Sequence, residues 1–196
     1  LRFFYEVSKR QRIDLLEVFF AEGYLEFPDL IEKREWRNIF LRLMGIVIRV
    51  GIVDVTLFFL EKGMDGNMIL DDRVTLLTFA CLCNKIDIVR LFLEHGADPT
   101  GEAVKYAVRC DDVRILDLLI MHGAKLRDCS NLWDGCYWML YTGEEREVFQ
   151  RLADHNVLPS EGLYFNIVAL SRCNPHLKDI VVMIREALER NGVSYE

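Results

Sequence analysis

Hydrophobic and polar residues follow the same order in five stretches of eleven residues along this chain. Each stretch carries apolar residues at helical spacing and closes with glycine or asparagine, the residue types that most easily end a helix in the left-handed conformation. Gly63 and Gly96 lie 33 residues apart, as do Gly123 and Asn156, whereas Gly96 and Gly123 lie 27 apart. Such agreement predicts a repeat protein. The five stretches are Ile13–Gly23, Val53–Gly63, Ile86–Gly96, Val113–Gly123 and Arg146–Asn156.

The clearest unit runs from Thr75 to Thr100. It begins Thr-Leu-Leu-Thr-Phe-Ala, breaks at the polar pair Asn84-Lys85, and continues with apolar positions at helical spacing as far as Gly96. This pattern predicts a short helix, a turn and a second helix. Gly96 is expected to end the second helix, since glycine adopts a positive φ without steric cost.

The unit resembles the ankyrin repeat, in which about 33 residues form a β-turn and two antiparallel helices. Residues 75–80 stand where that family has its Thr-Pro-Leu-His-x-Ala start, and Asn84-Lys85 stands at its usual Gly-His. Residues 88–98 match the second helix and its exit. The resemblance implies that a partner protein is recognised by a concave groove of inner helices and finger loops, with no cofactor.

We therefore predict an all-α fold, an ankyrin-like solenoid of about six stacked helix-turn-helix repeats with short finger loops. Stacked repeats bury apolar stripes that no single helix pair can bury alone. The whole chain, residues 1–196, is expected to form one ankyrin-repeat domain, and the absence of an initial methionine suggests a piece of a longer protein. The predicted units are residues 1–27, 37–67, 71–100, 101–127, 131–159 and 161–196.

Differences in length between the units predict where the loops change. Seven extra residues precede the second unit, where Pro28 and the charged run Glu32–Glu35 indicate an inserted helical turn before an inner helix near Ile39–Val50. Met64–Arg73 is expected to form the first full-length finger. The fourth unit is six residues short, so its finger is expected to be truncated or absent. A long final helix is expected at Lys178–Asn191.

Apolar positions of the middle units are expected in the core, with small side chains where helices approach closely. The close-approach positions are Val47, Ala80 and Ala107. The positions expected to be buried are Leu77, Ile88, Val89, Leu91, Leu93, Ile115, Leu116, Leu118 and Leu119.

Composition and charge narrow the classes of function that the chain can have. Hydrophobic residues make up 52% of the chain and charged residues 28%, enough for a substantial core. The net charge of −7 disfavours binding to nucleic acid or anionic membranes, and no apolar run is long enough for a membrane span. None of the six cysteines forms a Cys-x-x-Cys pair, so we expect reduced, mostly core thiols in a cytoplasmic or nuclear protein. A monomer with a protein partner is the expected state.

No motif predicts an enzyme, a metal site or a cofactor. His95, His122 and His155 share one register before a helix end, where histidine can bond the last carbonyl groups. Helices packed about 8–10 Å apart hold such histidines too far apart to share one zinc ion. Cys83 and Cys110 share another register, but neither lies in a nucleophile motif with a histidine.

Aromatic residues gather in the fifth unit, and both packing and a contact surface remain open for them. If they are exposed, they form the leading binding site, because exposed aromatic anchors dominate interface energetics. Finger and inner-helix positions would continue that site along the concave face. The predicted partner-binding residues are Asp71, Asp72, Val74, Leu82, Cys83, Arg109, Cys110, Trp133, Trp138 and Tyr141.

Two alternatives belong to other functional classes. The chain could be a regulatory or substrate-positioning domain of an enzyme that binds a small ligand, which a deep pocket with converging charges would favour. It could also bind nucleic acid or a nucleotide, which a contiguous basic face around Lys105, Arg109 and Arg114 would favour.

Overall fold

The computed structural model is mostly helical and divides into two compact units, Leu1–Ala103 and Val104–Glu196. We call these unit 1 and unit 2. The structure describes residues 6–7, 10, 12–22, 32, 34–71, 73–99, 101–110, 113–129, 131–135, 140 and 146–195. Within these residues, no helix combines the length and apolar character needed to cross a membrane.

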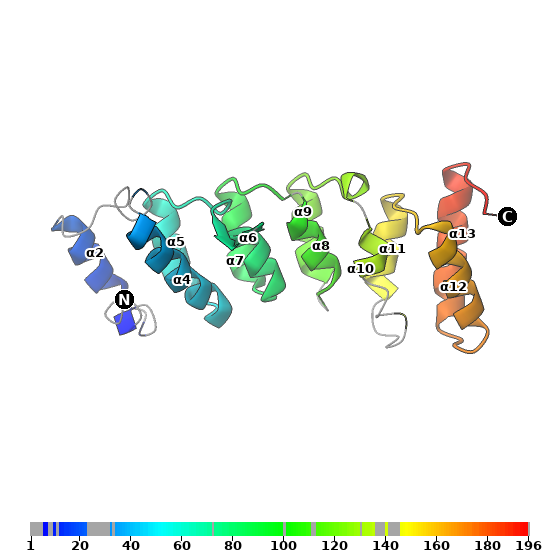
Figure 1. Cartoon of the computed structure of the whole chain (residues 1–196), viewed down its shortest axis with the longest axis horizontal. Helices are drawn as coiled ribbons and strands as arrows, with labels where there is room; N and C mark the ends of the chain where they lie inside the picture. Colours follow the sequence, from blue (N-terminus) through cyan, green and yellow to red (C-terminus); the bar gives the residue numbers. More distant parts are fainter. Residues whose placement is uncertain are drawn as a thin grey trace. The chain divides into compact units, whose positions relative to one another are not determined.

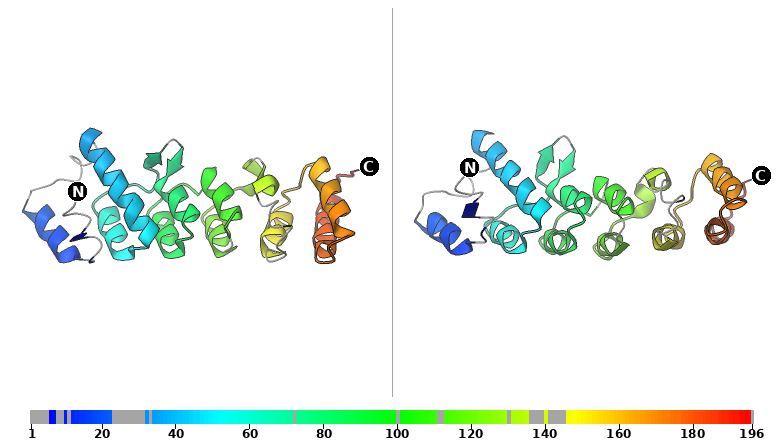
Figure 2. Two further views of the ribbon diagram at one scale, coloured as in Figure 1. Left: turned by 60° about the horizontal axis from the view of Figure 1, so that its bottom comes forward. Right: turned by 90° about the horizontal axis from the view of Figure 1, so that it is seen from below.

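Unit 1 has two layers of helices and a small antiparallel hairpin (Figure 1). Helices α4 and α6 form the layer that we call inner, and α5 and α7 form the layer that we call outer. The hairpin stands on the side of the inner helices (Figure 2). The elements are α2 (Ile13–Ala21), α4 (Arg34–Val50), α5 (Val53–Glu61), β1 (Ile69–Asp71), β2 (Val74–Thr75), α6 (Leu76–Leu82) and α7 (Ile86–Glu94).

Within unit 2, inner and outer helices also alternate along the sequence. Its outer helices are α9, α11 and α13, and its inner helices are α8, α10 and α12. The boundary between the two units falls within α8. The elements are α8 (Glu102–Val108), α9 (Val113–Met121), the 3-10 helix η1 (Leu126–Asp128), α10 (Leu132–Gly135), α11 (Arg146–Asp154), α12 (Glu161–Ser171) and α13 (Leu177–Arg190).

The five repeated stretches of the sequence all become helices that begin at the first residue of the stretch. These helices are α2, α5, α7, α9 and α11, each of nine residues. Four of the five closing residues are described, and all four have a positive φ. Their values are 98° for Gly63, 84° for Gly96, 97° for Gly123 and 54° for Asn156. The predicted repeat register is confirmed.

The hairpin of unit 1 is the finger expected at Met64–Arg73. Ile69 pairs with Thr75 and Asp71 with Val74 in an antiparallel register. The finger therefore adds a two-stranded sheet to a chain that we predicted to be all-α. Thr75 then starts α6, because its side-chain oxygen accepts a hydrogen bond from the backbone N–H of Thr78 at 3.1 Å.

The base of the finger packs against the end of the following outer helix. The side-chain oxygen of Asn67 accepts a hydrogen bond from the backbone N–H of Asp98 at 2.8 Å. A Cβ atom at Gly66 would lie 2.9 Å from the Cβ of Ala97 and 3.0 Å from a ring carbon of Phe92, so only glycine fits there. The finger is thus fixed to α7 as well as to α6.

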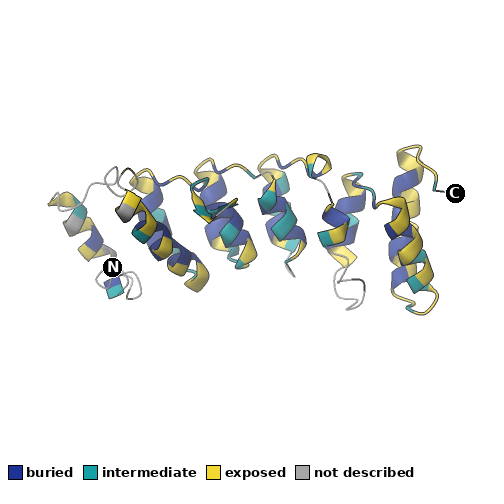
Figure 3. Ribbon diagram, viewed as in Figure 1, coloured by how far each residue is buried: buried dark blue, intermediate teal, exposed yellow. Residues whose placement is uncertain are grey.

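The core of unit 1 lies between the two helix layers and includes a cluster of phenylalanine rings. Phe40 of α4 meets Phe59 of α5 edge to face at 5.1 Å, and Phe20 of α2 meets Phe58 at 5.5 Å. Figure 3 shows buried and exposed residues alternating around each helix. The positions predicted to be buried are confirmed except for Leu91 and Leu118, which are half-buried.

Polar side chains link the outer helices of unit 2 to one another. Arg151 of α11 forms two hydrogen bonds with the carboxylate of Asp117 of α9, at 2.6 and 3.1 Å. Arg190 of α13 donates to the carbonyl oxygen of Ala153, and Arg127 donates to that of His155, both at 3.2 Å. The bonds from Arg190 and Arg127 go to carbonyl groups at the C-terminal end of α11, where a helix provides no intrahelical donor four residues on.

The structure also corrects two expected boundaries. Helix α4 begins at Arg34 rather than near Ile39, because part of the charged run continues the helix instead of forming a separate turn. The final helix begins at Leu177 and ends at Arg190, one residue earlier at each end. Between α7 and α8, residues 97–99 and 101 contain no strand, as expected for the shortened fourth unit.

Candidate partner-binding face

Four of the predicted partner-binding residues lie on the hairpin and inner helix of unit 1. Asp71 is exposed in β1, Val74 is half-buried in β2, and Leu82 at the end of α6 is 49% exposed. Cys83 follows α6 and is half-buried. The two strands contact α6, and the hairpin stands on the side of the inner helices, away from α5 and α7 (Figure 2). Asp72 lies outside the described residues.

Two further predicted residues, Arg109 and Cys110, follow α8 in unit 2. The guanidinium carbon of Arg109 lies 6.0 Å from the centroid of the Tyr106 ring, and the side chain is exposed. Its aliphatic part faces Gly135 at the end of α10, where an added Cβ would lie 3.5 Å from the Cγ of Arg109. Cys110 is half-buried. Trp138 and Tyr141 fall outside the described part of the chain.

Trp133 belongs to the core of unit 2, which corrects its place among the predicted surface residues. Its side chain is only 4% exposed. The ring stacks on Phe149 of α11 at 5.4 Å, and its Nε1–H donates a hydrogen bond to the carbonyl oxygen of Val157 at 2.9 Å. A buried indole normally satisfies its N–H in this way. Of the two alternatives for the aromatic residues of the fifth unit, packing in the core rather than a contact surface therefore holds for Trp133.

Helix α4, the inner helix predicted near Ile39–Val50, carries an exposed stripe that was not among the predicted partner-binding residues. Arg42, Ile46 and Arg49 follow one another at spacings of four and three residues, which places them on one side of a helix. All three are exposed, and Ile46 keeps 40% of its surface accessible. Two arginines at helical spacing within an otherwise apolar stretch were the signal that could have identified this surface.

The stripe adjoins the hairpin and α6. Gly45, which precedes Ile46, lies against Leu70 of β1 and Phe79 of α6, at 3.6 and 4.0 Å from an added Cβ. The guanidinium carbon of Arg49 lies 5.8 Å from the centroid of the Phe79 ring, a cation–π contact. We define the inner patch as Arg42, Ile46 and Arg49 of α4, Ile69 of β1 and Leu82 of α6.

Cys83 borders the inner patch and lies near two cations. Burial raises the pKa of its thiol above the ordinary value of 9.0, and the positive charges of Arg49 and Lys85 offset part of that rise. Lys85 extends over Gly51 at the end of α4, with its Nζ 3.6 Å from an added Cβ there. A thiol with a raised pKa is a poor nucleophile, so this arrangement does not suit cysteine catalysis.

The two helix layers of unit 1 carry opposite charge. The sequence of inner helix α4 contains four arginines and one glutamate, and α6 contains no charged residue. Outer helices α5 and α7 together contain four acidic residues and one arginine. The negative total of the chain therefore conceals a basic inner surface on unit 1.

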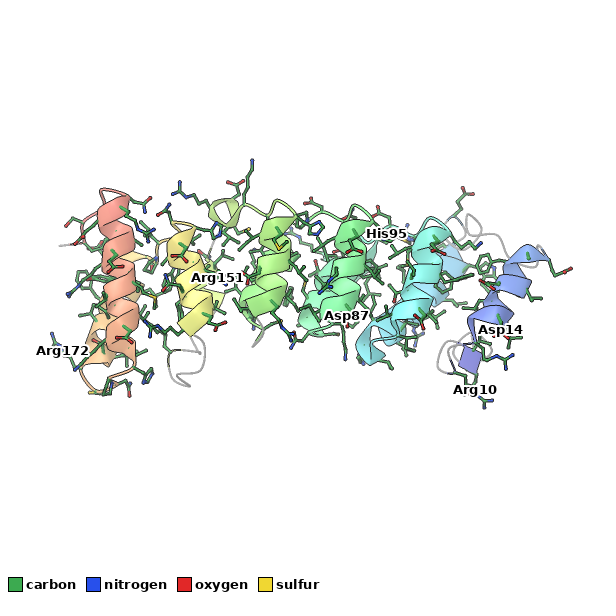
Figure 4. The ribbon with its side chains drawn as sticks, turned by 180° about the vertical axis from the view of Figure 1, so that it is seen from behind. Arg10, Asp14, Asp87, His95, Arg151 and Arg172 are labelled. Carbon is green, nitrogen blue, oxygen red and sulfur yellow. The ribbon has the colours of Figure 1, made fainter. Side chains whose placement is uncertain are left out.

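The three histidines of the predicted register each directly follow the last residue of α7, α9 or α11. The Nδ1 of His95 lies 2.9 Å from the carbonyl oxygen of Leu91, and Figure 4 shows the side chain at the end of α7 opposite Asp87. His122 and His155 are exposed at the equivalent positions. Among the described residues, no three His, Cys, Asp or Glu side chains are grouped so that they could hold a metal ion.

The cysteines are less buried than we predicted. Of those described, Cys81 is buried, Cys83, Cys110 and Cys129 are half-buried, and Cys173 is exposed. All five are free thiols. Their exposure follows from their places near the ends of helices, where packing is less complete than in the middle of a repeat.

Comparison with models of protein families gives a match in the middle of the chain. Residues 43–131 match a family model described as ankyrin repeats (3 copies). The matched range covers most of the second predicted unit and all of the third and fourth, and over this range the resemblance drawn from the sequence is confirmed. Comparisons with curated proteins and with solved structures give no match.

Proposed function

We propose that this chain, whose residues 43–131 contain ankyrin repeats, is a non-catalytic scaffold that binds a partner protein through its inner helices and finger. Ankyrin repeats are in general protein-interaction modules. The flanking helices extend the same alternation of inner and outer helices, which supports a solenoid of about six repeats over residues 1–196.

The observation that carries this proposal is the exposure of three apolar side chains on one side of unit 1. Ile46, Ile69 and Leu82 are 40%, 51% and 49% exposed, and they come from three different elements that contact one another. Single exposed apolar residues are common and need no explanation. Here three lie on the finger and inner helices, the elements through which this type of repeat is expected to bind its partner.

Affinity capture from the native cell tests the proposal when wild-type protein is compared with Leu82→Glu. A negative charge in place of Leu82 should abolish capture of a partner that binds the inner side. Met121→Glu is the matched control and should keep the partner, because Met121 is 79% exposed at the end of outer helix α9. Capture that survives Leu82→Glu would refute binding through the inner helices.

A further inference from the structure

We propose that the inner patch binds an acidic segment of the partner protein in which carboxylates alternate with apolar side chains. This inference rests on the proposed function and specifies the chemistry of the partner. It follows from the charge, the spacing and the apolar composition of the patch.

Two cations define the charged part of the inner patch. Arg42 and Arg49 are exposed on the same side of α4, and no described carboxylate forms an ion pair with either. Seven residues of helix place them about 10 Å apart along the axis, at a rise of about 1.5 Å per residue. The guanidinium group can bind a carboxylate through two parallel hydrogen bonds, so each arginine suits one acidic side chain.

The apolar side chains of the inner patch come from α4 itself and from the two elements that adjoin it. Ile46 lies between Arg42 and Arg49 on the exposed stripe, and Ile69 and Leu82 come from the adjoining hairpin and helix. Exposed ion pairs alone contribute little to affinity, because water competes for both charges. The apolar side chains therefore supply the surface whose burial would hold a partner segment in place.

The charge of the rest of unit 1 favours one side for an acidic partner. Acidic residues on α5 and α7 repel such a segment from the outer layer, while the arginines of α4 attract it to the inner layer. The acidic residues of the inner elements are Glu35 in the first turn of α4 and Asp71 in β1. Asp71 would keep carboxylates away from the finger and direct them toward α4.

The spacing of the two arginines also indicates how far apart the carboxylates of a bound segment should be. A polyproline II segment has three residues per turn and rises about 3.1 Å per residue, so side chains three positions apart lie on one face about 9 Å from each other. Glutamate at every third position would match Arg42 and Arg49. We therefore choose a fluorescein-labelled peptide of repeating Glu-Pro-Leu as the probe.

Fluorescence anisotropy with the full chain tests this inference. We expect the Glu-Pro-Leu peptide to bind, and the double variant Arg42→Glu/Arg49→Glu to bind it at least about tenfold more weakly. The double variant Arg42→Gln/Arg49→Gln should also weaken binding, without introducing new negative charge. Arg172→Glu/Lys178→Glu is the matched control, because it changes the same charge at two exposed positions of unit 2 and should alter affinity by less than about twofold.

Companion probes separate the parts of the inference. Repeating Lys-Pro-Leu should not bind, and repeating Glu-Pro-Ser should bind more weakly than Glu-Pro-Leu because it lacks apolar side chains. Equal binding of the Lys-Pro-Leu peptide, unchanged affinity in both arginine variants, or tighter binding to phosphatidylserine vesicles or to a thymidine oligonucleotide would overturn the inference. So would the absence of Glu-Pro-Leu binding at about 1 mM peptide.

The native partner distinguishes failure of this inference from failure of the proposed function. A partner that is lost with Leu82→Glu but retained by Arg42→Gln/Arg49→Gln would leave the proposed function standing and overturn acidic recognition. A partner that is retained by Leu82→Glu would refute the proposed function itself.

Discussion

The guanidinium group of Arg49 lies over the ring of Phe79, with 5.8 Å between the guanidinium carbon and the ring centroid. This contact joins inner helix α4 to inner helix α6 across the surface that we propose as the binding site. It keeps a positive charge beside Leu82 and Cys83, at the end of α6. The same arginine thus contributes to packing between repeats and to the charge that a partner would meet.

The pKa of the Cys83 thiol depends on the positive charge of Arg49. Its raised pKa predicts that alkylation by iodoacetamide, followed for each cysteine by mass spectrometry, reaches half its maximal rate above pH 9.0, since only the thiolate reacts. Arg49→Gln removes a nearby cation that lowers the pKa, so this variant should move the midpoint to still higher pH. Exposed Cys173 serves as the internal control for the amount of reagent. A midpoint for Cys83 at or below pH 9.0 would contradict this picture.

Leu93 tests the packing of unit 1. It is 4% exposed on α7, and its replacement by alanine should lower the free energy of unfolding by about 2–5 kcal/mol. Arg90→Ala, at an exposed position of the same helix, should change stability by no more than about 0.5 kcal/mol. Urea unfolding measures both. Equal effects of the two substitutions would show that the register assigned to α7 is wrong.

Trp133 tests the packing of unit 2. Trp133→Ala removes a buried ring that stacks on Phe149 and should cost about 3–5 kcal/mol. Trp133→Phe keeps an aromatic ring but leaves the carbonyl oxygen of Val157 without its donor, for which we expect a loss of about 1–3 kcal/mol. Thermal or urea unfolding gives both values. If Trp133→Ala left the free energy of unfolding unchanged, Trp133 would have to be exposed rather than buried.

The outer helices could be predicted from the sequence to the residue at which they begin. Val53, Ile86 and Val113 each open a helix because the apolar spacing and the glycine that follows are local signals, visible in a single stretch. The finger at Met64–Arg73 could be placed for the same reason, although its pairing as a two-stranded sheet was not foreseen. Local pattern thus accounts for most of the architecture.

The candidate site was predicted less completely, because exposure depends on neighbouring elements. Ile46 lies in an apolar stretch, and whether it is buried depends on how far the finger extends over α4. Trp133 is of a residue type that often anchors protein interfaces. In this structure, however, it packs on Phe149 and bonds the carbonyl group of Val157, both distant in sequence. Neither outcome follows from residue type or helical spacing alone.

Site-specific photo-cross-linking tests the central claim most directly, with p-benzoylphenylalanine placed at position 82 or at position 90 of the full chain. Leu82 ends inner helix α6, whereas Arg90 is exposed on outer helix α7 of the same repeat. Binding through the inner helices predicts that the captured partner cross-links from position 82 and not from position 90. Cross-linking from position 90 with none from position 82 would contradict it.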